Sequence, residues 1–198
     1  MKKIPAYATL VLILTLMLAA MPTDADAAIY EDTLRLHILA NSDSKEDQEV
    51  KLRLRDEILT VFGSRLSDCR DIEDAKENVS LLLEEIESHS REFLSSVGVD
   101  YPVTANLSVE WYGTRSYDGF TLPCGYYNSL RIIIGSGEGK NWWCVMYPPL
   151  CMDIATKDAP ADDATLNYSN EELRLIAGGK YNVKFKLLEV LSSAFRKK

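Results

Sequence analysis

The sequence predicts an α+β fold, a mainly antiparallel sheet covered by amphipathic helices, in a single domain after a signal peptide. Three patterns support this prediction. Residues 33–40 alternate as a strand does, residues 44–97 place apolar side chains at helical spacing, and residues 103–147 return to the two-residue period of strands. Amphipathic helices that lie between strands need a sheet on which to bury their apolar sides.

The N-terminus has the three parts of a secretory signal peptide. A pair of lysines precedes the uncharged apolar run 6–21, and Ala25 and Ala27 supply the small residues of a cleavage site. The run is shorter than the ~20 residues that a membrane span usually needs. We predict that residues 1–27 are a signal peptide cleaved after Ala27 and that residues 28–198 form one exported domain. A retained N-terminal anchor is the alternative.

The first strand and helix are separated by a run of capping residues. The strand 33–40 has one face of leucine and isoleucine, with Arg35 and His37 on the other. Residues 41–44 (Asn-Ser-Asp-Ser) suit a helix N-terminus, and Ser44 with Asp47 resembles a capping box. The helix that follows is predicted to stop at Gly63, because glycine favours helix ends.

The remaining elements follow from the same two periods. A second helix is predicted from Asp71 to Gly98, and strands are predicted at 103–112, 116–121 (a short edge strand), 130–134 and 142–147. The glycine-rich loop 135–140 has the turn chemistry of a hairpin between the last two strands. After the insert 153–167, two more helices are predicted, one opening at Ser169 and one over 183–195.

Composition limits the partners of the domain. The chain has 22 basic and 30 acidic residues, a formal net charge of −8. Nucleic acids and anionic membrane surfaces select basic patches, so we expect neither as a partner. We also expect no cofactor and no small-molecule substrate.

The most specialised stretch is residues 141–151, NWWCVMYPPLC. It combines two of the three tryptophans with two of the four cysteines and a proline pair. Tryptophan and tyrosine bury large, rigid areas at low entropy cost, so they anchor both cores and binding sites. This stretch is therefore the centre of the fold or a surface for a partner.

Cys144 and Cys151 are the natural pair for a disulfide in an exported chain. An extended strand would hold them ~23 Å apart, so the bond requires a chain reversal near Tyr147-Pro148-Pro149. Burial of both as thiols is the equal alternative. Cys69 and Cys124 are weaker candidates.

Catalytic and metal sites have little support. The glycine-rich loop is followed by a strand, whereas a phosphate-binding loop is followed by a helix. Only two histidines are present, so we predict no metal site. A cysteine-type hydrolase would pair His37 with Cys124 or Cys144, but nothing in the sequence brings them together. His37 is more simply a hydrogen-bonded structural residue.

Two blocks resemble one known family. Residues 34–44, LRLHILANSDS, with Asp47-Gln48 and RLRD at 53–56, resemble the opening motif of the stage II sporulation protein R family. Residues 122–151, which run from LPCG to NWWCV and PPLC, are similar to its central signature, and residues 184–186 resemble its C-terminal end. Cys124 and Tyr112-Gly113 depart from the family pattern, so Cys124 is not expected in a shared disulfide.

The resemblance implies a function in endospore formation. Members of this family look like messengers exported by the forespore into the space between the two sporulation membranes. There they are thought to activate a membrane-embedded aspartic protease of the mother cell, which then processes the mother-cell sigma factor precursor. The alternatives are an exported cysteine-type hydrolase of the cell envelope and a passive envelope or coat component.

For a protein that acts by contact, we hypothesise two partner-binding surfaces. The first is formed by Trp142, Trp143, Tyr147, Pro148 and Pro149. Because adjacent residues alternate across a strand, one tryptophan could instead be core. The second is the turn with Asn41 and Asp43, although helix capping alone explains its residues. His37 could serve either surface.

Overall fold

The computed structural model describes residues 3–19, 24–67, 69–117 and 120–148, together with Tyr168, Glu172, Leu173 and Ile176. The chain divides into two compact units. The larger contains residues 30–110 and 126–169, and the smaller contains residues 1–29, 111–125 and 170–198. Helices accompany a mixed, mostly antiparallel sheet, which confirms the predicted α+β class.

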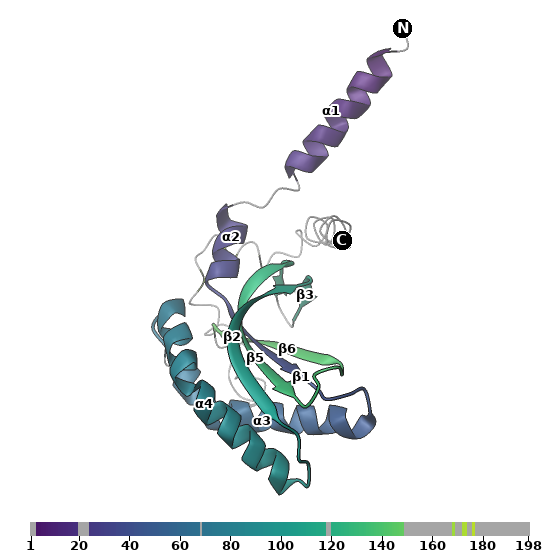
Figure 1. Ribbon diagram of the computed structural model, residues 1–198. Coiled ribbons are helices and arrows are strands. Elements are labelled where there is room, and N and C mark those ends of the chain that lie inside the picture. The colour runs from purple at the N-terminus through teal and green to yellow at the C-terminus, as the bar shows by residue number, and fades with distance from the viewer. Residues whose placement is uncertain are drawn as a thin grey trace. The chain divides into compact units, whose positions relative to one another are not determined.

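A four-stranded sheet with the order β2-β5-β1-β6 forms the larger unit (Figure 1). Its strands are β1 (Leu34–Leu39), β2 (Val103–Tyr112), β5 (Gly125–Ile134) and β6 (Asn141–Tyr147). β1 pairs in parallel with β5 and antiparallel with β6. The first strand of the sheet in sequence therefore lies between the last two.

This strand order contradicts the predicted hairpin at 135–140. β5 and β6 run in opposite directions but are not neighbours, because both pair with β1. The loop that joins them crosses the end of β1. The residues of a turn indicate that the chain reverses its direction. They do not indicate whether a third strand will pair between the two strands that the turn connects.

β1 is buried on both faces. Leu34, Leu36 and Ile38 form one face, and Arg35 and His37 lie on the other, yet all five are less than 9% exposed. The predicted alternation of faces is present, but the polar face is covered as well. Burial on both faces is usual for a central strand.

Two long helices, α3 (Lys45–Ser67) and α4 (Ile72–Ser96), lie together on one face of the sheet (Figure 1). The core of the larger unit lies between the helices and the sheet. Each fully buried aliphatic side chain there contributes about 1.5–3 kcal/mol. The residues of this core include Leu36, Ile38, Leu54, Ile58, Phe62, Val79, Ile86, Leu94, Leu130 and Ile132.

The predicted ends of α4 are confirmed, and the predicted end of α3 is wrong. Asp71 caps α4 by accepting a hydrogen bond of 2.9 Å from the Asp74 N–H, and Gly98 follows the helix with a φ of +80°. α3 continues through Gly63, which is buried beside Phe62. Burial of the surrounding turn outweighs the glycine penalty of roughly 0.5–1 kcal/mol.

The smaller unit contains α1 (Lys3–Ala19), most of α2 (Asp24–Glu31) and a small hairpin of β3 (Arg115–Ser116) and β4 (Thr121–Leu122). The predicted edge strand 116–121 is therefore wrong. Two short antiparallel strands flank a turn in which the Tyr117 N–H donates to the Phe120 carbonyl at 2.8 Å.

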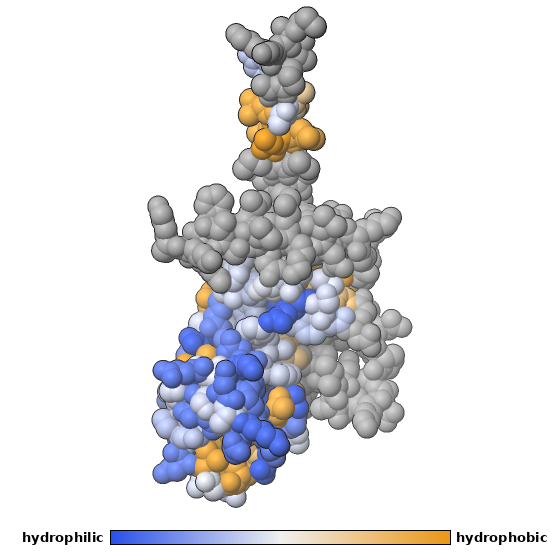
Figure 2. All heavy atoms as spheres, turned by 90° about the vertical axis from the view of Figure 1, so that its right-hand side faces the viewer, coloured by the Kyte–Doolittle hydropathy of each residue, from blue (hydrophilic) through white to orange (hydrophobic). Residues whose placement is uncertain are grey.

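Most of the predicted apolar run forms α1, and Figure 2 shows apolar side chains exposed on it. Within the described ranges, no helix is both long enough and apolar enough to cross a membrane. The predicted cleavage site after Ala27 falls inside α2. Glu172, Leu173 and Ile176 are helical, as predicted after Ser169, whereas 153–167 and the helix 183–195 lie outside the described residues.

Candidate functional site

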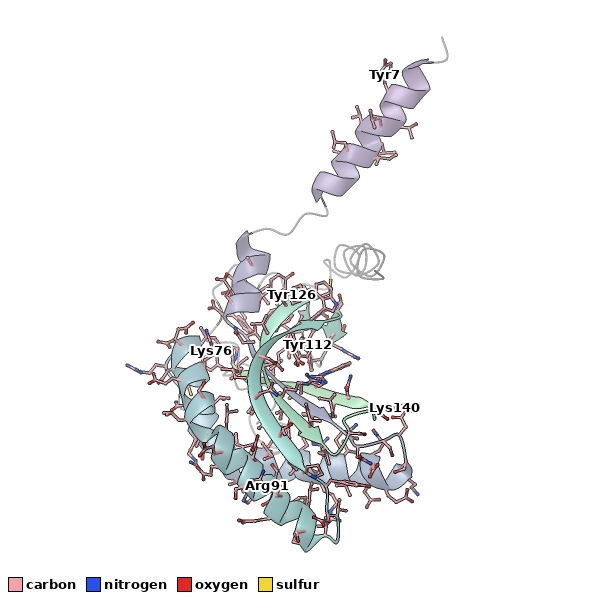
Figure 3. All side chains as sticks on the ribbon, viewed as in Figure 1. Tyr7, Lys76, Arg91, Tyr112, Tyr126 and Lys140 are labelled. Atoms are coloured by element: carbon pink, nitrogen blue, oxygen red, sulfur yellow. The ribbon has the colours of Figure 1, made fainter. Side chains whose placement is uncertain are left out.

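Two loops that are far apart in the sequence are bound together at one end of the sheet. They are residues 41–44, between β1 and α3, and residues 135–140, between β5 and β6; we call them the loop pair. Because the second loop must cross the end of β1, it meets the first. Lys140, labelled in Figure 3, lies at this end of the sheet near the start of α3.

Asn41 makes contacts on both sides of the loop pair. Its Oδ1 accepts a hydrogen bond from the Ser136 N–H at 3.0 Å, and its backbone carbonyl accepts one from the Ser136 hydroxyl at 2.7 Å. Its Nδ2 donates to Asp47 Oδ2 at 3.0 Å. The other loop must come this close at Gly135, whose φ is +59° and where a Cβ would lie 2.2 Å from Asn41 Oδ1. Asn41 therefore has a structural role within the chain.

Asp43 and Lys51 hold the backbone of Lys140. Asp43 Oδ1 accepts a hydrogen bond of 2.7 Å from the Lys140 N–H, and Lys51 Nζ donates one of 2.8 Å to the Lys140 carbonyl. Lys51 is only 4% exposed and also donates to Gln48 Oε1 at 2.7 Å. Burial lowers the pKa of the Lys51 ammonium, while the charge of Asp43 opposes this shift.

Half of the predicted capping box is present. The Asp47 N–H donates to Ser44 Oγ at 3.1 Å, as the motif requires. The Asp47 carboxylate instead accepts hydrogen bonds from Ser42 Oγ at 2.5 Å and from Asn41. The hydrogen bond from Ser42, followed by that from Asn41, lowers the pKa of Asp47, although its burial opposes the shift. The carboxylate is used to fix the loop.

Trp142 and Trp143 lie on opposite faces of β6, and both are half-buried. Trp142 lies opposite Ile38 and carries the Arg55 guanidinium over its ring, 5.0 Å from the ring centroid. Trp143 lies opposite His37, and the centroids of their rings are 5.7 Å apart. Neither tryptophan is fully buried, so each retains surface for a contact.

The other residues of the first hypothesised surface are placed differently. Tyr147 is 4% exposed, and its pKa is raised by burial and by nearby acidic groups. Pro148 is buried, and Pro149 lies outside the described residues. Buried side chains cannot touch a partner directly, which narrows the hypothesis to the two tryptophans.

A polar cluster on the sheet face opposite α3 and α4 was missed by the sequence analysis. Glu110 of β2 lies 2.7 Å from His37 Nδ1 and 3.3 Å from Arg131 Nε of β5. Burial raises the pKa of the Glu110 carboxyl, but His37, Ser129 and Arg131 together outweigh it, so the net pKa is lowered. In the sequence, the only indication of this cluster was that two polar residues, Arg35 and His37, occur in an otherwise apolar strand.

The geometry does not support Cys144 as a thiolate partner of His37. Cys144 lies opposite Leu36, on the helix-covered face, whereas His37 lies on the other face. Cys144 is also disulfide-bonded, so its sulfur is not a nucleophile. Cys69 and Cys124 are buried thiols. Cys151 lies outside the described residues, and its pairing with Cys144 stays a prediction.

In the part of the chain that the structure describes, no three histidine, cysteine or acidic residues are grouped in a way that could hold a metal ion. The side chains at the start of β6 are instead suited to contact with a partner. The Arg55 guanidinium lies over the half-buried ring of Trp142. The imidazole of His37, which is paired with Glu110, lies beside the half-buried ring of Trp143.

These features define an α+β protein with an apolar N-terminal helix and a candidate contact surface of aromatic and charged side chains. The chain belongs to the stage II sporulation protein R family, whose family model matches residues 30–157. The match confirms the resemblance in residues 34–44 and in the NWWC segment and indicates a role in sporulation. Residues 184–186 lie outside it.

One curated relative supports the same assignment. The chain is 33% identical over 132 residues to stage II sporulation protein R of Bacillus subtilis (strain 168). The aligned region covers 66% of this chain and 59% of the relative, which is less than two thirds of the relative's length. No solved structure matches the chain.

Proposed function

We propose that this protein is an exported signalling protein of endospore formation. In this proposal it activates a membrane-embedded aspartic protease of the mother cell, which processes the mother-cell sigma factor precursor. It acts by contact and catalyses no reaction itself. Family membership supports the sporulation setting, and the signal-peptide pattern of residues 1–27 supports export into the intermembrane space.

The observation that carries a contact mechanism is the placement of Trp142 and Trp143. Both are half-buried at the start of β6, whereas the strand is buried from Cys144 to Tyr147. Large aromatic side chains that are held rigidly and remain partly exposed are typical of interface anchors. The surrounding fold immobilises them, so binding costs less side-chain entropy than it would for free side chains.

Reconstitution in a non-sporulating bacterial host tests the proposal. The membrane protease and the sigma factor precursor are expressed with and without this chain, and cleavage of the precursor is followed by gel. We expect cleavage only when the full chain is present, and none when residues 1–27 are deleted. Cleavage that is independent of this chain, or its absence despite confirmed export of a folded protein, would refute the proposal.

Variants then locate the surface. Trp142→Ala and Trp143→Ala are expected to weaken cleavage strongly at equal protein levels, because truncating an interface anchor typically costs more than 1 kcal/mol of binding. Tyr126→Ala is the matched control, since Tyr126 is an exposed aromatic residue of the same sheet at 59% exposure. Equal effects of all three substitutions would show that the tryptophans are not the contact.

A further inference from the structure

One face of α3 makes two contacts with the chain around Trp142. Lys51 and Arg55 are four residues apart and so lie one above the other on that face. Lys51 Nζ binds the backbone carbonyl of Lys140 at 2.8 Å, and Arg55 covers the ring of Trp142 at 5.0 Å. Lys51 and Arg55 thus contact the backbone of residue 140 and the side chain of residue 142, two positions further along the chain.

The loop pair also binds the backbone of Lys140, through its N–H group. The Lys140 N–H donates to Asp43 Oδ1 at 2.7 Å, so both backbone polar groups of Lys140 are bound by side chains from the β1–α3 region. Lys51 is buried, and its carbonyl contact gives the ammonium a hydrogen-bond acceptor that burial requires. Residue 140 is therefore fixed immediately before the strand that carries Trp142.

We infer that Asp43 and Lys51 are positioning residues, which set the orientation and exposure of Trp142 by clamping the backbone of Lys140. The inference rests on the proposed contact role of Trp142 for its functional consequence. Its structural part stands without that role. Asp43 was hypothesised above to bind a partner. In this inference it instead acts by binding the backbone of Lys140.

The test uses the full-length chain with Trp111→Phe and Trp143→Phe, so that Trp142 is the one fluorescent indole. Lys51→Met keeps the length of the side chain and removes its donor. We expect red-shifted Trp142 emission and stronger acrylamide quenching, with an unchanged far-ultraviolet circular dichroism spectrum. Lys45→Met, at an exposed position of the same helix, should leave both signals as they were.

Asp43 provides the second, independent variant. Asp43→Ala should shift the Trp142 signals as Lys51→Met does, whereas Asp43→Asn retains an acceptor oxygen and should restore them. Asp43 is exposed, so these variants are informative even where Lys51→Met does not fold. Unchanged emission and quenching in folded Asp43→Ala would overturn the inference.

The functional readout uses the same substitutions in the otherwise unchanged chain. In the reconstituted system, Asp43→Ala should need about tenfold more protein for half-maximal cleavage and reach the same maximum, because an incorrectly oriented anchor weakens binding. Failure of cleavage by the unsubstituted chain would count against the proposed function alone. The fluorescence measurement requires no protease and decides the positioning role by itself.

Discussion

Glu110 on β2 reaches across β5 to His37 on β1, and 2.7 Å separates Glu110 Oε2 from His37 Nδ1. Arg131, on the strand between them, lies 3.3 Å from the other carboxylate oxygen. Three strands are thus linked by one carboxylate on the face opposite α3 and α4. The Glu110 side chain is only 18% exposed, so these charged contacts are poorly screened by solvent.

Substitution Glu110→Gln should lower the free energy of unfolding by about 1–3 kcal/mol at neutral pH, because it leaves buried polar groups without their charged partner. The native pKa of Glu110 is lowered, so its stabilisation is full above the unfolded-state pKa of about 4.3 and is lost as the pH falls through the lower native pKa. Urea unfolding from pH 7 to pH 3 should therefore show a smaller acid destabilisation in Glu110→Gln.

Glu84→Gln provides the comparison, since Glu84 is an exposed carboxylate on α4. It should keep the pH dependence of the unsubstituted protein. A full acid destabilisation in Glu110→Gln would show that the cluster around Glu110 does not stabilise the fold. Asp47 also has a lowered pKa, so some acid dependence remains in either variant.

Gly139→Ala should destabilise the loop pair. A Cβ on Gly139 would lie 2.2 Å from the backbone carbonyl oxygen of Ser42, and a backbone atom cannot move aside as a side chain can. We expect a loss of about 1–3 kcal/mol in the free energy of unfolding. Thermal and urea unfolding would measure it.

Gly98→Ala separates this steric effect from backbone strain. Gly98 has a φ of +80° but no atom within 4 Å of an added Cβ, so its cost of about 1–2 kcal/mol arises from the dihedral angle alone. In the reconstituted system that tests the proposed function, precursor cleavage should fall with Gly139→Ala and persist with Gly98→Ala at equal folded concentration. Loss of cleavage with Gly98→Ala but not with Gly139→Ala would contradict a functional role of the loop pair.

Asp47→Ala should cost about 1–3 kcal/mol of stability, because Asn41 Nδ2 and Ser42 Oγ both lose the carboxylate that accepts their hydrogen bonds. Glu46→Ala is the control, since Glu46 is exposed in the same first turn of α3 and has the same favourable position at the positive helix end. Equal losses in the two variants would attribute the effect of Asp47 to the helix dipole alone.

Peptide mapping without reducing agent should place Cys144 in a disulfide, with Cys151 as the predicted partner. Cys69 and Cys124 should react with iodoacetamide only after unfolding, because both are buried. Reduction of the disulfide should lower stability by about 2–3 kcal/mol in the chain-entropy model. Rapid labelling of Cys144 in the native, non-reduced protein would exclude the bond.

The sequence predicted correctly those helix ends and strands that depend on residues close together in the chain. The capping residue Asp71 and the glycine at 98 delimit α4, and the alternation at 103–112 identifies β2. The end of α3 was missed because the burial of Gly63 and Phe62 outweighs the local preference of glycine. Packing is not visible in a window of a few residues.

Strand order and the polar cluster were not predictable in the same way. The loop 135–140 looks like a hairpin because nothing in it records that β1 will lie between its two strands. Glu110, Arg131 and His37 come from three strands, and their meeting depends on the register of β1 with β5. For the two tryptophans, the two-residue period was sufficient to predict their opposite faces.

The central place of β1 has a consequence for how the protein is made. A chain that emerges N-terminus first, from a ribosome or through a membrane pore, presents this apolar strand long before either neighbour is available. β1 can complete its pairing with β5 only after residue 134 has emerged, and its pairing with β6 only after residue 147 has emerged. Completion of the sheet must therefore wait for most of the chain, and any shorter product leaves a bare strand edge that invites association with other chains.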